Sequence, residues 1–178
     1  MSCVTLRRFE APTIGMISVR NAGGAAAAKV DVRFLRATLA AALEAAGYAG
    51  WDVGCRNVSL AAMTALNKRY RGKDAPTDIL SFANYRLPRP EAFPPPDALD
   101  LGRDLGDLVV CADYVAAVLA RGNVTVTHPQ QHWRVLMVHG VVHLLGYDHE
   151  TETDHAAMAA REAALLARLP PLPPQQLR

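Results

Sequence analysis

The segment HGVVHLLGYDH, from His139 to His149, places three histidines at the end of one of the most apolar stretches of the chain. Histidine titrates near neutral pH, and its ring costs free energy to bury unless its nitrogens find partners. Three imidazoles in such a segment therefore call for a common partner, and a metal ion is the first candidate. The segment constrains the fold more than any other, because it requires a helix that carries histidines and then ends in a turn.

The spacing of the three histidines sets the geometry of this segment. Residues four apart on a helix lie about 6 Å apart along its axis and on one face, so His139 and His143 project side by side. His149 joins them only if the chain reverses sharply after Leu145. Gly146 permits that reversal, because glycine just beyond a helix adopts the left-handed conformation without strain. We therefore expect all three rings to meet.

Three neutral imidazoles with water as the fourth ligand are typical of a catalytic zinc rather than a closed structural site. The competing interpretation is a set of core histidines that donate to backbone carbonyls. A lone His-x-x-x-His pair would favour that interpretation, whereas the glycine turn and the third histidine favour a metal. We predict one Zn²⁺ per chain, held by His139, His143 and His149, although nickel or copper also accepts three imidazoles.

The neighbouring polar residues are weaker candidates for this site. His132 lies seven residues before His139, about 10 Å along the helix, which is too far for the same ion. His128 precedes the helix and is a possible cap, and His155 in the next helix is expected to be solvated or to support a ligand. Asp148 either orients an imidazole or closes a turn.

Length and composition indicate one globular domain in a reducing compartment. The chain has 178 residues, 51% of them hydrophobic, and a formal charge of +2 that leaves the partner open. Its three cysteines, Cys3, Cys55 and Cys111, are too scattered for a disulfide framework. Neither an export signal nor a membrane span is recognisable, so we expect a cytoplasmic protein.

Apolar periodicity and capping residues predict an α+β fold with a small, mixed, four-stranded sheet and about five helices. Asp31 and Ser59 are expected near helix starts, Gly47 and Gly72 at helix ends. The prolines between Pro88 and Pro96 indicate an exposed, stiff loop. The expected strands are 15–21, 51–55, 77–84 and 105–111, and the expected helices are 30–47, 59–72, 112–122, 129–146 and 151–169.

These elements define one domain over residues 17–169. A leader, residues 1–16, is expected to be flexible. A Pro-rich tail, residues 170–178, is expected to be disordered or loosely docked.

The spacing His-x3-His-x2-Gly-x2-His matches the metal-binding motif of the metzincin proteases. Where those proteases carry a glutamate as general base, this chain has Gly140, which cannot take a proton. Peptide hydrolysis of that type is therefore disfavoured. Glycine inside a helix costs about 1 kcal/mol relative to alanine, so Gly140 indicates a close approach by a neighbouring strand or a bulky substrate.

Three blocks together, LNKRYRGKDAPTDILSF, LGDLVVC and HGVVHLLGYDH, resemble the YbeY family of bacterial single-strand-specific endoribonucleases, over about residues 17–169. The resemblance implies a zincin-like fold, a metal on the three histidines and a role in 16S rRNA 3′-end maturation and ribosome quality control. The implied partners are single-stranded RNA, the 16S rRNA precursor, and the small ribosomal subunit with its proteins, without DNA or membranes. The chain departs from the family in its alanine content, its leader and its proline-filled loop.

Arg71, in YRGKD, is the functional arginine that the resemblance implies. At a helix end, an arginine complements the helix dipole even without a catalytic role. Beside a metal, its guanidinium can bind two phosphate oxygens on which negative charge develops. We predict that Arg71 and the metal-bound water are the catalytic groups. Lys68, Arg69 and Lys73 form either a basic rim for RNA or a solvated face.

The two strand blocks supply further candidates. Ser81 is predicted to line the cleft and contact substrate, while Thr77 and Asp78 are expected to close a turn. Phe82 either stacks on a base or packs in the core, and core packing is the more common use. Asp107 is interpreted as an acidic residue at a strand edge.

Two other functions stay open at this point. One is a zincin-type metalloprotease, which cleavage of unstructured protein instead of RNA would reveal. The other is a non-catalytic ribosome-assembly factor with a structural zinc, in which loss of His143 would unfold the protein.

Overall fold

A computed structural model describes residues 15–23, 28–85, 87, 89–92, 102–122 and 129–172 of the chain. Residues 1–14 and 173–178, most of the proline-rich segment and His128 lie outside the described residues. The elements in chain order are β1 (Ile17–Asn21), α1 (Val32–Ala46), β2 (Asp52–Asn57), α2 (Leu60–Arg71), β3 (Ile79–Ala83), β4 (Asp104–Val110), α3 (Ala112–Ala120), α4 (Pro129–Leu144) and α5 (Glu152–Arg168).

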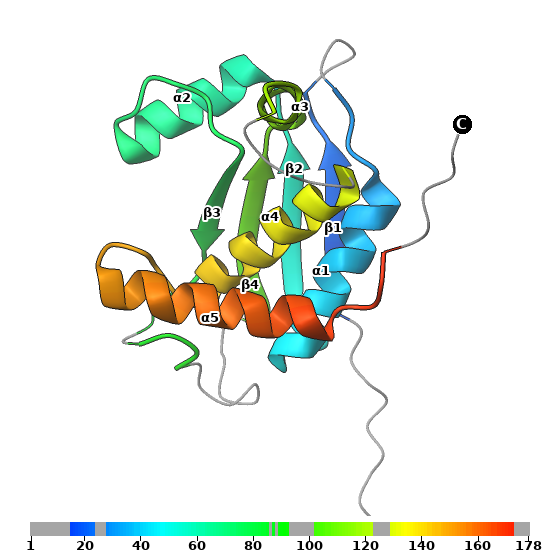
Figure 1. Ribbon diagram of the computed structural model, residues 1–178, viewed down its shortest axis with the longest axis vertical. Coiled ribbons are helices and arrows are strands. Elements are labelled where there is room, and N and C mark those ends of the chain that lie inside the picture. Colours follow the sequence, from blue (N-terminus) through cyan, green and yellow to red (C-terminus); the bar gives the residue numbers. More distant parts are fainter. Residues whose placement is uncertain are drawn as a thin grey trace, which may run out of the picture.

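The predicted α+β class, the four-stranded mixed sheet and the five helices are confirmed. The strand order is β1-β2-β4-β3. β1, β2 and β4 are parallel, and β3 pairs antiparallel with β4. β3 is therefore an edge strand, and Figure 1 shows it running opposite to β4, with which it pairs.

The main core lies between the sheet and the α1–α4 layer, with α5 packed outside α4 (Figure 1). Leu108 of β4 and Met137 of α4 are fully buried there. A smaller cluster occupies the other face of the sheet, where Met63 of α2 packs on Leu80 and Val109. Because strand side chains alternate between faces, Ile79 and Ser81 share the α4 face. This alternation decides which β3 residues lie near the histidines.

Local signals fix the helix ends, as predicted at Asp31, Ser59, Gly47 and Gly72. The side chains of Asp31, Ser59 and Thr151 cap α1, α2 and α5 by accepting backbone N–H groups. Gly47 and Gly72 end α1 and α2 at positive φ, +88° and +70°.

None of the helices in the described part of the chain is long and apolar enough to cross a bilayer. Cys55 and Cys111 are buried free thiols.

Candidate metal centre and cleft

The chain reverses at the end of α4, as the sequence predicts. Gly146 adopts φ +87°. Its N–H donates to the carbonyl of His143 (2.9 Å), and the N–H of Tyr147 donates to the carbonyl of Val142 (3.2 Å). These two bonds form a Schellman motif, which closes the helix and turns the chain back on itself. His149, three residues beyond the glycine, is thereby returned toward the helix.

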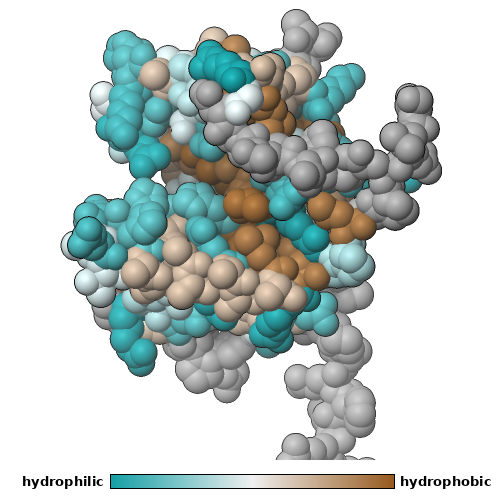
Figure 2. Space-filling view, viewed as in Figure 1, coloured by the Kyte–Doolittle hydropathy of each residue, from teal (hydrophilic) through white to brown (hydrophobic). Residues whose placement is uncertain are grey.

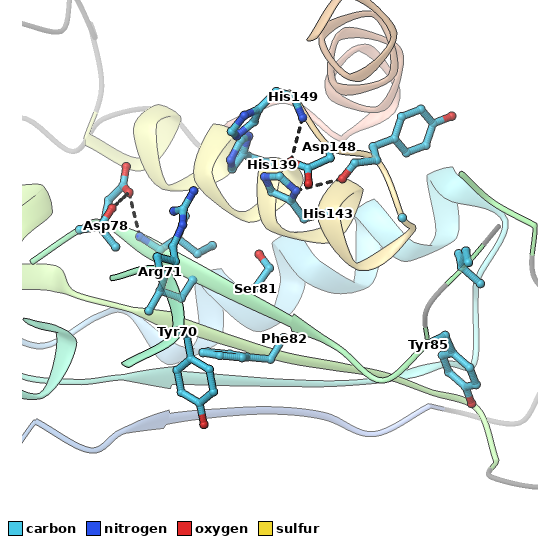
Figure 3. Close-up of a pocket in the computed structure, with 16 residues that line it drawn as sticks. Tyr70, Arg71, Asp78, Ser81, Phe82, Tyr85, His139, His143, Asp148 and His149 are labelled. Carbon is cyan, nitrogen blue, oxygen red and sulfur yellow. Dashed lines mark hydrogen bonds between the residues drawn. The ribbon is translucent and has the colours of Figure 1, made fainter. Parts of the chain in front are cut away.

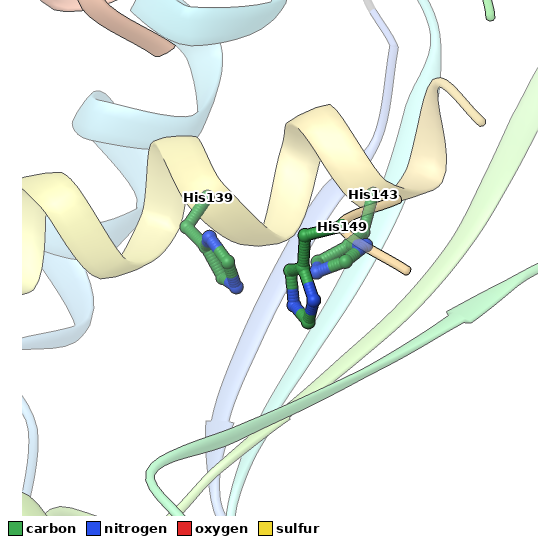
Figure 4. A group of neighbouring side chains, drawn as sticks. All are labelled: His139, His143 and His149. Atoms are coloured by element: carbon green, nitrogen blue, oxygen red, sulfur yellow. The ribbon is translucent and has the colours of Figure 1, made fainter. Parts of the chain in front are cut away.

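The three predicted histidines converge on one point. Ring centroids are 4.6 Å apart for His139 and His143, 5.2 Å for His143 and His149, and 6.0 Å for His139 and His149. One nitrogen of each ring lies within 4.8 Å of the other two. Figure 4 shows the rings directed to the same side of α4. This set of imidazole donors fits a metal ion such as zinc, and no second such cluster exists within the described ranges.

Both helical histidines are anchored through Nδ1. His143 Nδ1 lies 3.0 Å from the carbonyl oxygen of Tyr147, and His139 Nδ1 lies 2.7 Å from Oε1 of Glu162. A carbonyl oxygen only accepts, so Nδ1 of His143 carries the proton and Nε2 keeps its lone pair. Anchoring of this kind is the usual outer arrangement around metal-binding histidines.

Electrostatics keep His143 in the form that a metal needs. Burial lowers the pKa of His143 below its ordinary value of 6.5, and the neighbouring His139 lowers it further. Its carbonyl partner, Tyr147, opposes the shift but does not cancel it. Because metals bind the neutral ring, the shift favours metal binding near neutral pH.

Glu162 is the residue of this site that sequence reasoning missed. It lies on α5 in the row Met158, Glu162, Leu165 and Leu169, whose other members are buried. A glutamate at a core-facing position of a helix is a signal in itself, because a carboxylate resists burial without a partner.

Asp148 and the secondary histidines are not part of the cluster of candidate metal ligands. Asp148 Oδ1 accepts the backbone N–H of His149 at 2.8 Å, so its observed bond is to the backbone. His155 borders a small cavity of about 170 Å³ behind His139 and His149. His132 is partly buried on α4 and lines neither cavity.

A cleft of about 840 Å³ opens in front of the triad. Its far side is formed by the end of α2 and by β3 (Figure 3). Tyr70, Phe82, Tyr85 and Tyr147 supply aromatic rings to its lining, and of these only Phe82 was a candidate from the sequence. In Figure 2, hydrophilic residues border the hollow between α2 and the α4–α5 layer. The cleft therefore combines flat apolar rings with a polar rim.

Arg71 is the cation of this cleft. It is the last residue of α2, is exposed, and lines the cleft opposite the triad, with its guanidinium directed inward (Figure 3). No acidic side chain within the described residues forms an ion pair with it. The buried amide of Asn67 donates to the carbonyl of Ala75 (2.7 Å), which fixes the loop after Arg71.

The other basic residues of α2 lie outside the cleft lining. Lys68 pairs with Asp74 at 2.6 Å, and both side chains are largely exposed. Arg69 lies over the ring of Tyr70, 5.3 Å from its centroid, and Lys73 is exposed.

The predicted β3 residues border the cleft. The hydroxyl of Ser81 is buried and has no hydrogen-bond partner among the described residues. Asp78 Oδ1 accepts from the Thr77 hydroxyl and from the Ile79 N–H, so this pair does shape the turn before β3. Phe82 packs edge-on against Tyr70 at 5.0 Å, and it belongs to both the small core cluster and the cleft.

Two other positions differ in detail from the sequence analysis. Asp107 lies inside β4, a central strand, where its carboxylate fills the space above Gly54. Gly140 faces Leu108 and Ile79, so the close approach comes from the sheet and not from a substrate.

The fold and site define an α+β protein with a three-histidine candidate metal centre at one side of an aromatic-lined cleft. The sequence model of the family described as Endoribonuclease YbeY matches residues 25–170. The "Endoribonuclease YbeY" of Halorhodospira halophila is 37% identical over 163 residues, covering 91% of this chain and 97% of that one. That of Magnetococcus marinus is 42% identical over 126 residues, covering 67% and 83%. The chain belongs to the YbeY family.

A solved structure supports the fold. The solution structure of TM1509 from Thermotoga maritima matches with a TM-score of 0.54 and 21% identity, covering 86% of this chain and 88% of that one. At this identity, the likeness concerns the fold alone.

Proposed function

We propose that this protein is a zinc-dependent, single-strand-specific endoribonuclease whose catalytic domain spans residues 17–169. It acts in the cytoplasm, in the maturation of the 16S rRNA 3′ end and in ribosome quality control. Family membership supports the reaction class. The observation that carries the proposal is the position of the Arg71 guanidinium across one cleft from three convergent imidazoles.

His139, His143 and His149 would hold one Zn²⁺ per chain. Such an ion supplies a Lewis acid for a phosphoryl oxygen and lowers the pKa of a coordinated water. The protein's own contribution is to favour the neutral form of His143, whose pKa is lowered by burial, and to hold the rings of His139 and His143 through Nδ1.

Arg71 would stabilise the charge that develops when a phosphodiester is cleaved. Its guanidinium is planar and can bind two nonbridging oxygens at once. Because no described acidic residue neutralises it, its full charge is available to the substrate. Arg71 thus acts on the scissile phosphate from the side opposite the histidines.

The remaining cleft residues would select single strands. Tyr70, Phe82 and Tyr85 offer rings on which unpaired bases stack, and bases inside a duplex are not available for such contacts. Ser81 would donate its unpartnered hydroxyl to the bound strand after a small shift. On the adjoining surface, Lys73 would attract the phosphate backbone, and Lys68 would exchange its exposed ion pair with Asp74 for a phosphate contact.

The test combines metal analysis with cleavage by the full-length protein. We expect one zinc per chain and cleavage of a single-stranded RNA oligonucleotide, but not of the same sequence in a duplex or of an unstructured protein. His143→Ala should lose metal and cleavage yet still unfold cooperatively. His132→Ala, on the same helix but outside the cleft, is the matched control and should keep both.

Three results would contradict the proposal: absence of bound metal, cleavage of the unstructured protein instead of RNA, or His143→Ala protein without a cooperative unfolding transition. The last would indicate a structural zinc. The product ends identify the nucleophile, because attack by the 2′-hydroxyl leaves a 2′,3′-cyclic phosphate and attack by water does not. For the cellular role, depletion should accumulate 3′-extended 16S rRNA, which wild-type protein should correct and Arg71→Ala should not.

A further inference from the structure

Glu162 connects α5 to the candidate metal centre. Its Oε1 lies 2.7 Å from Nδ1 of His139, and the two side chains are only 22% and 30% exposed. Within the described residues, this is the one ion pair or hydrogen bond that the Glu162 side chain makes. The neighbouring cation on α5, Arg161, is directed elsewhere, to Glu91. Among the described residues, His139 is therefore the one polar partner of this carboxylate.

The position of Glu162 on α5 makes this contact specific. Met158 precedes it by four residues and Leu165 follows by three, and both are buried, so the three share the face that packs on α4. An apolar residue at position 162 would continue that face without desolvating a charge. A core-facing carboxylate whose polar partner, among the described residues, is an imidazole indicates a role that depends on the imidazole.

The contact determines which nitrogen of His139 faces the cleft. An ionised carboxylate only accepts hydrogen bonds, so Nδ1 of His139 carries the proton and Nε2 keeps a free lone pair. The Tyr147 carbonyl does the same for His143. The two anchors differ in one respect: the carbonyl is neutral, whereas Glu162 places a carboxylate beside the ring, and an outer carboxylate strengthens the bond between a histidine and its metal.

We infer that Glu162 is a positioning residue, which holds His139 as the Nδ1–H tautomer with Nε2 directed to the metal position and strengthens metal binding through its charge. The inference rests on the proposed metal dependence. Glu162 does not itself line the cleft, so its effect reaches the site only through His139, which does.

The experiment compares zinc affinity, measured by competition with a chromogenic chelator, in wild type, Glu162→Ala and Glu162→Gln. Removal of an outer partner of a metal ligand typically costs 10- to 100-fold in affinity, and we expect this loss for Glu162→Ala. Glu162→Gln should be intermediate, because its amide oxygen still accepts from Nδ1 but carries no charge. Glu152→Ala, in the first turn of the same helix, is the charge-matched control and should bind within about twofold of wild type. His155→Ala borders the same small cavity and controls for local packing.

A second readout separates positioning from general stability. In the metal-free proteins, ¹⁵N–¹H correlation spectra of the histidine rings report the tautomer directly. His139 should be the Nδ1–H tautomer in wild type and Glu162→Gln, and should populate Nε2–H in Glu162→Ala. A purely structural role would lower the melting temperature without changing the tautomer. If Glu162→Ala fails to fold, Glu162→Gln provides the test, because it must still bind zinc more weakly than wild type.

The inference is overturned if zinc affinity and the His139 tautomer in the Glu162 variants match those of Glu152→Ala. Failure of the proposed function gives a different pattern: wild type would bind no zinc at all, while its metal-free spectrum would still report whether Glu162 sets the tautomer of His139.

Discussion

Gly140 of α4 faces Leu108 of β4 so closely that a side chain at position 140 would force its neighbours to shift. A β-carbon there would lie 2.8 Å from Leu108 Cδ2 and 2.8 Å from Ile79 Cδ1. Leu108 is fully buried and Ile79 is 6% exposed, so neither side chain can move aside freely. The missing side chain lets α4 lie against the sheet, and it explains why the glutamate of the metzincin motif has no counterpart here.

We expect Gly140→Ala to destabilise the protein. Alanine gains about 1 kcal/mol of helix propensity over glycine, but overpacking a buried interface costs about 1 to 3 kcal/mol. The free energy of unfolding, from urea denaturation, should therefore fall. In the Gly140→Ala/Leu108→Ala double variant, the vacated leucine site should accept the new methyl group, so its destabilisation should be smaller than the sum of the two single effects. Additive effects, or a stabilised Gly140→Ala, would contradict this account of the helix–sheet approach.

The sequence is sufficient to predict features that local chemistry controls. Ser59 and Gly72 bound α2 because side-chain and left-handed caps act within a few residues. The histidine triad is predictable for the same reason: its members lie within eleven residues, and a glycine at position 146 indicates that the helix ends there in the left-handed conformation. Spatial partners from other segments are less accessible: the pairing of Glu162 with His139 spans 23 residues and two helices. The position of Arg71 opposite the triad depends on β3 occupying the sheet edge, which is decided by long-range strand pairing.

Substitution of Arg71 should impair cleavage without affecting the metal. The guanidinium has no ion-pair partner within the described residues and lines the cleft, so its removal leaves no buried charge unpaired. Loss of one group that stabilises developing charge typically costs about 10² to 10³ in rate. We expect a decrease of that order in kcat/KM for Arg71→Ala, with unchanged zinc content and with an unfolding free energy lowered by no more than about 1 kcal/mol, because this cation also complements the dipole of α2. Arg71→Lys should recover only part, because an ammonium cannot bind two oxygens in a fork.

Arg69→Ala is the matched control for Arg71, since it removes the same charge from the same turn. Arg69 lies over Tyr70 and outside the cleft lining. Equal losses in the Arg69 and Arg71 variants would mean that general electrostatic attraction, and not contact with the reacting phosphate, explains the effect.

The ion pair between Arg161 and Glu91 should hold α5 to the segment around Glu91, beside the end of α4. The two side chains are 21% and 30% exposed and 2.6 Å apart, and the Glu91 N–H also donates to the carbonyl of Leu145. Glu91 is held at φ +56°, which a non-glycine residue adopts at a cost. Arg161→Ala leaves a partly buried carboxylate unpaired, so we expect a loss of about 1 to 2 kcal/mol in unfolding free energy. Glu91→Ala in the same background should restore part of it. If Arg161→Ala alone is as stable as wild type, the ion pair contributes nothing to the free energy of unfolding.

Cys55 should make the protein sensitive to alkaline pH. Burial, together with the nearby Asp107 carboxylate, raises the pKa of the Cys55 thiol to about 12 from its ordinary value of 9.0. Between these two values the folded state binds more protons than the unfolded state, so stability is complete below about pH 9 and decreases as the pH rises above it. The slope attributable to one group reaches at most about 1.4 kcal/mol per pH unit.

Comparison with Cys55→Ala separates the contribution of the thiol from that of the tyrosines, which also titrate at about pH 10. The variant loses packing at every pH but has no thiol to ionise, so its stability deficit relative to wild type, measured by urea denaturation, should shrink from pH 8 to pH 10.5. Val53→Ala removes buried atoms from the same face of β2 without a titratable group, and its deficit should stay constant over that range. A deficit of Cys55→Ala that is equally constant would mean that the folded protein does not hold this thiol in its protonated form.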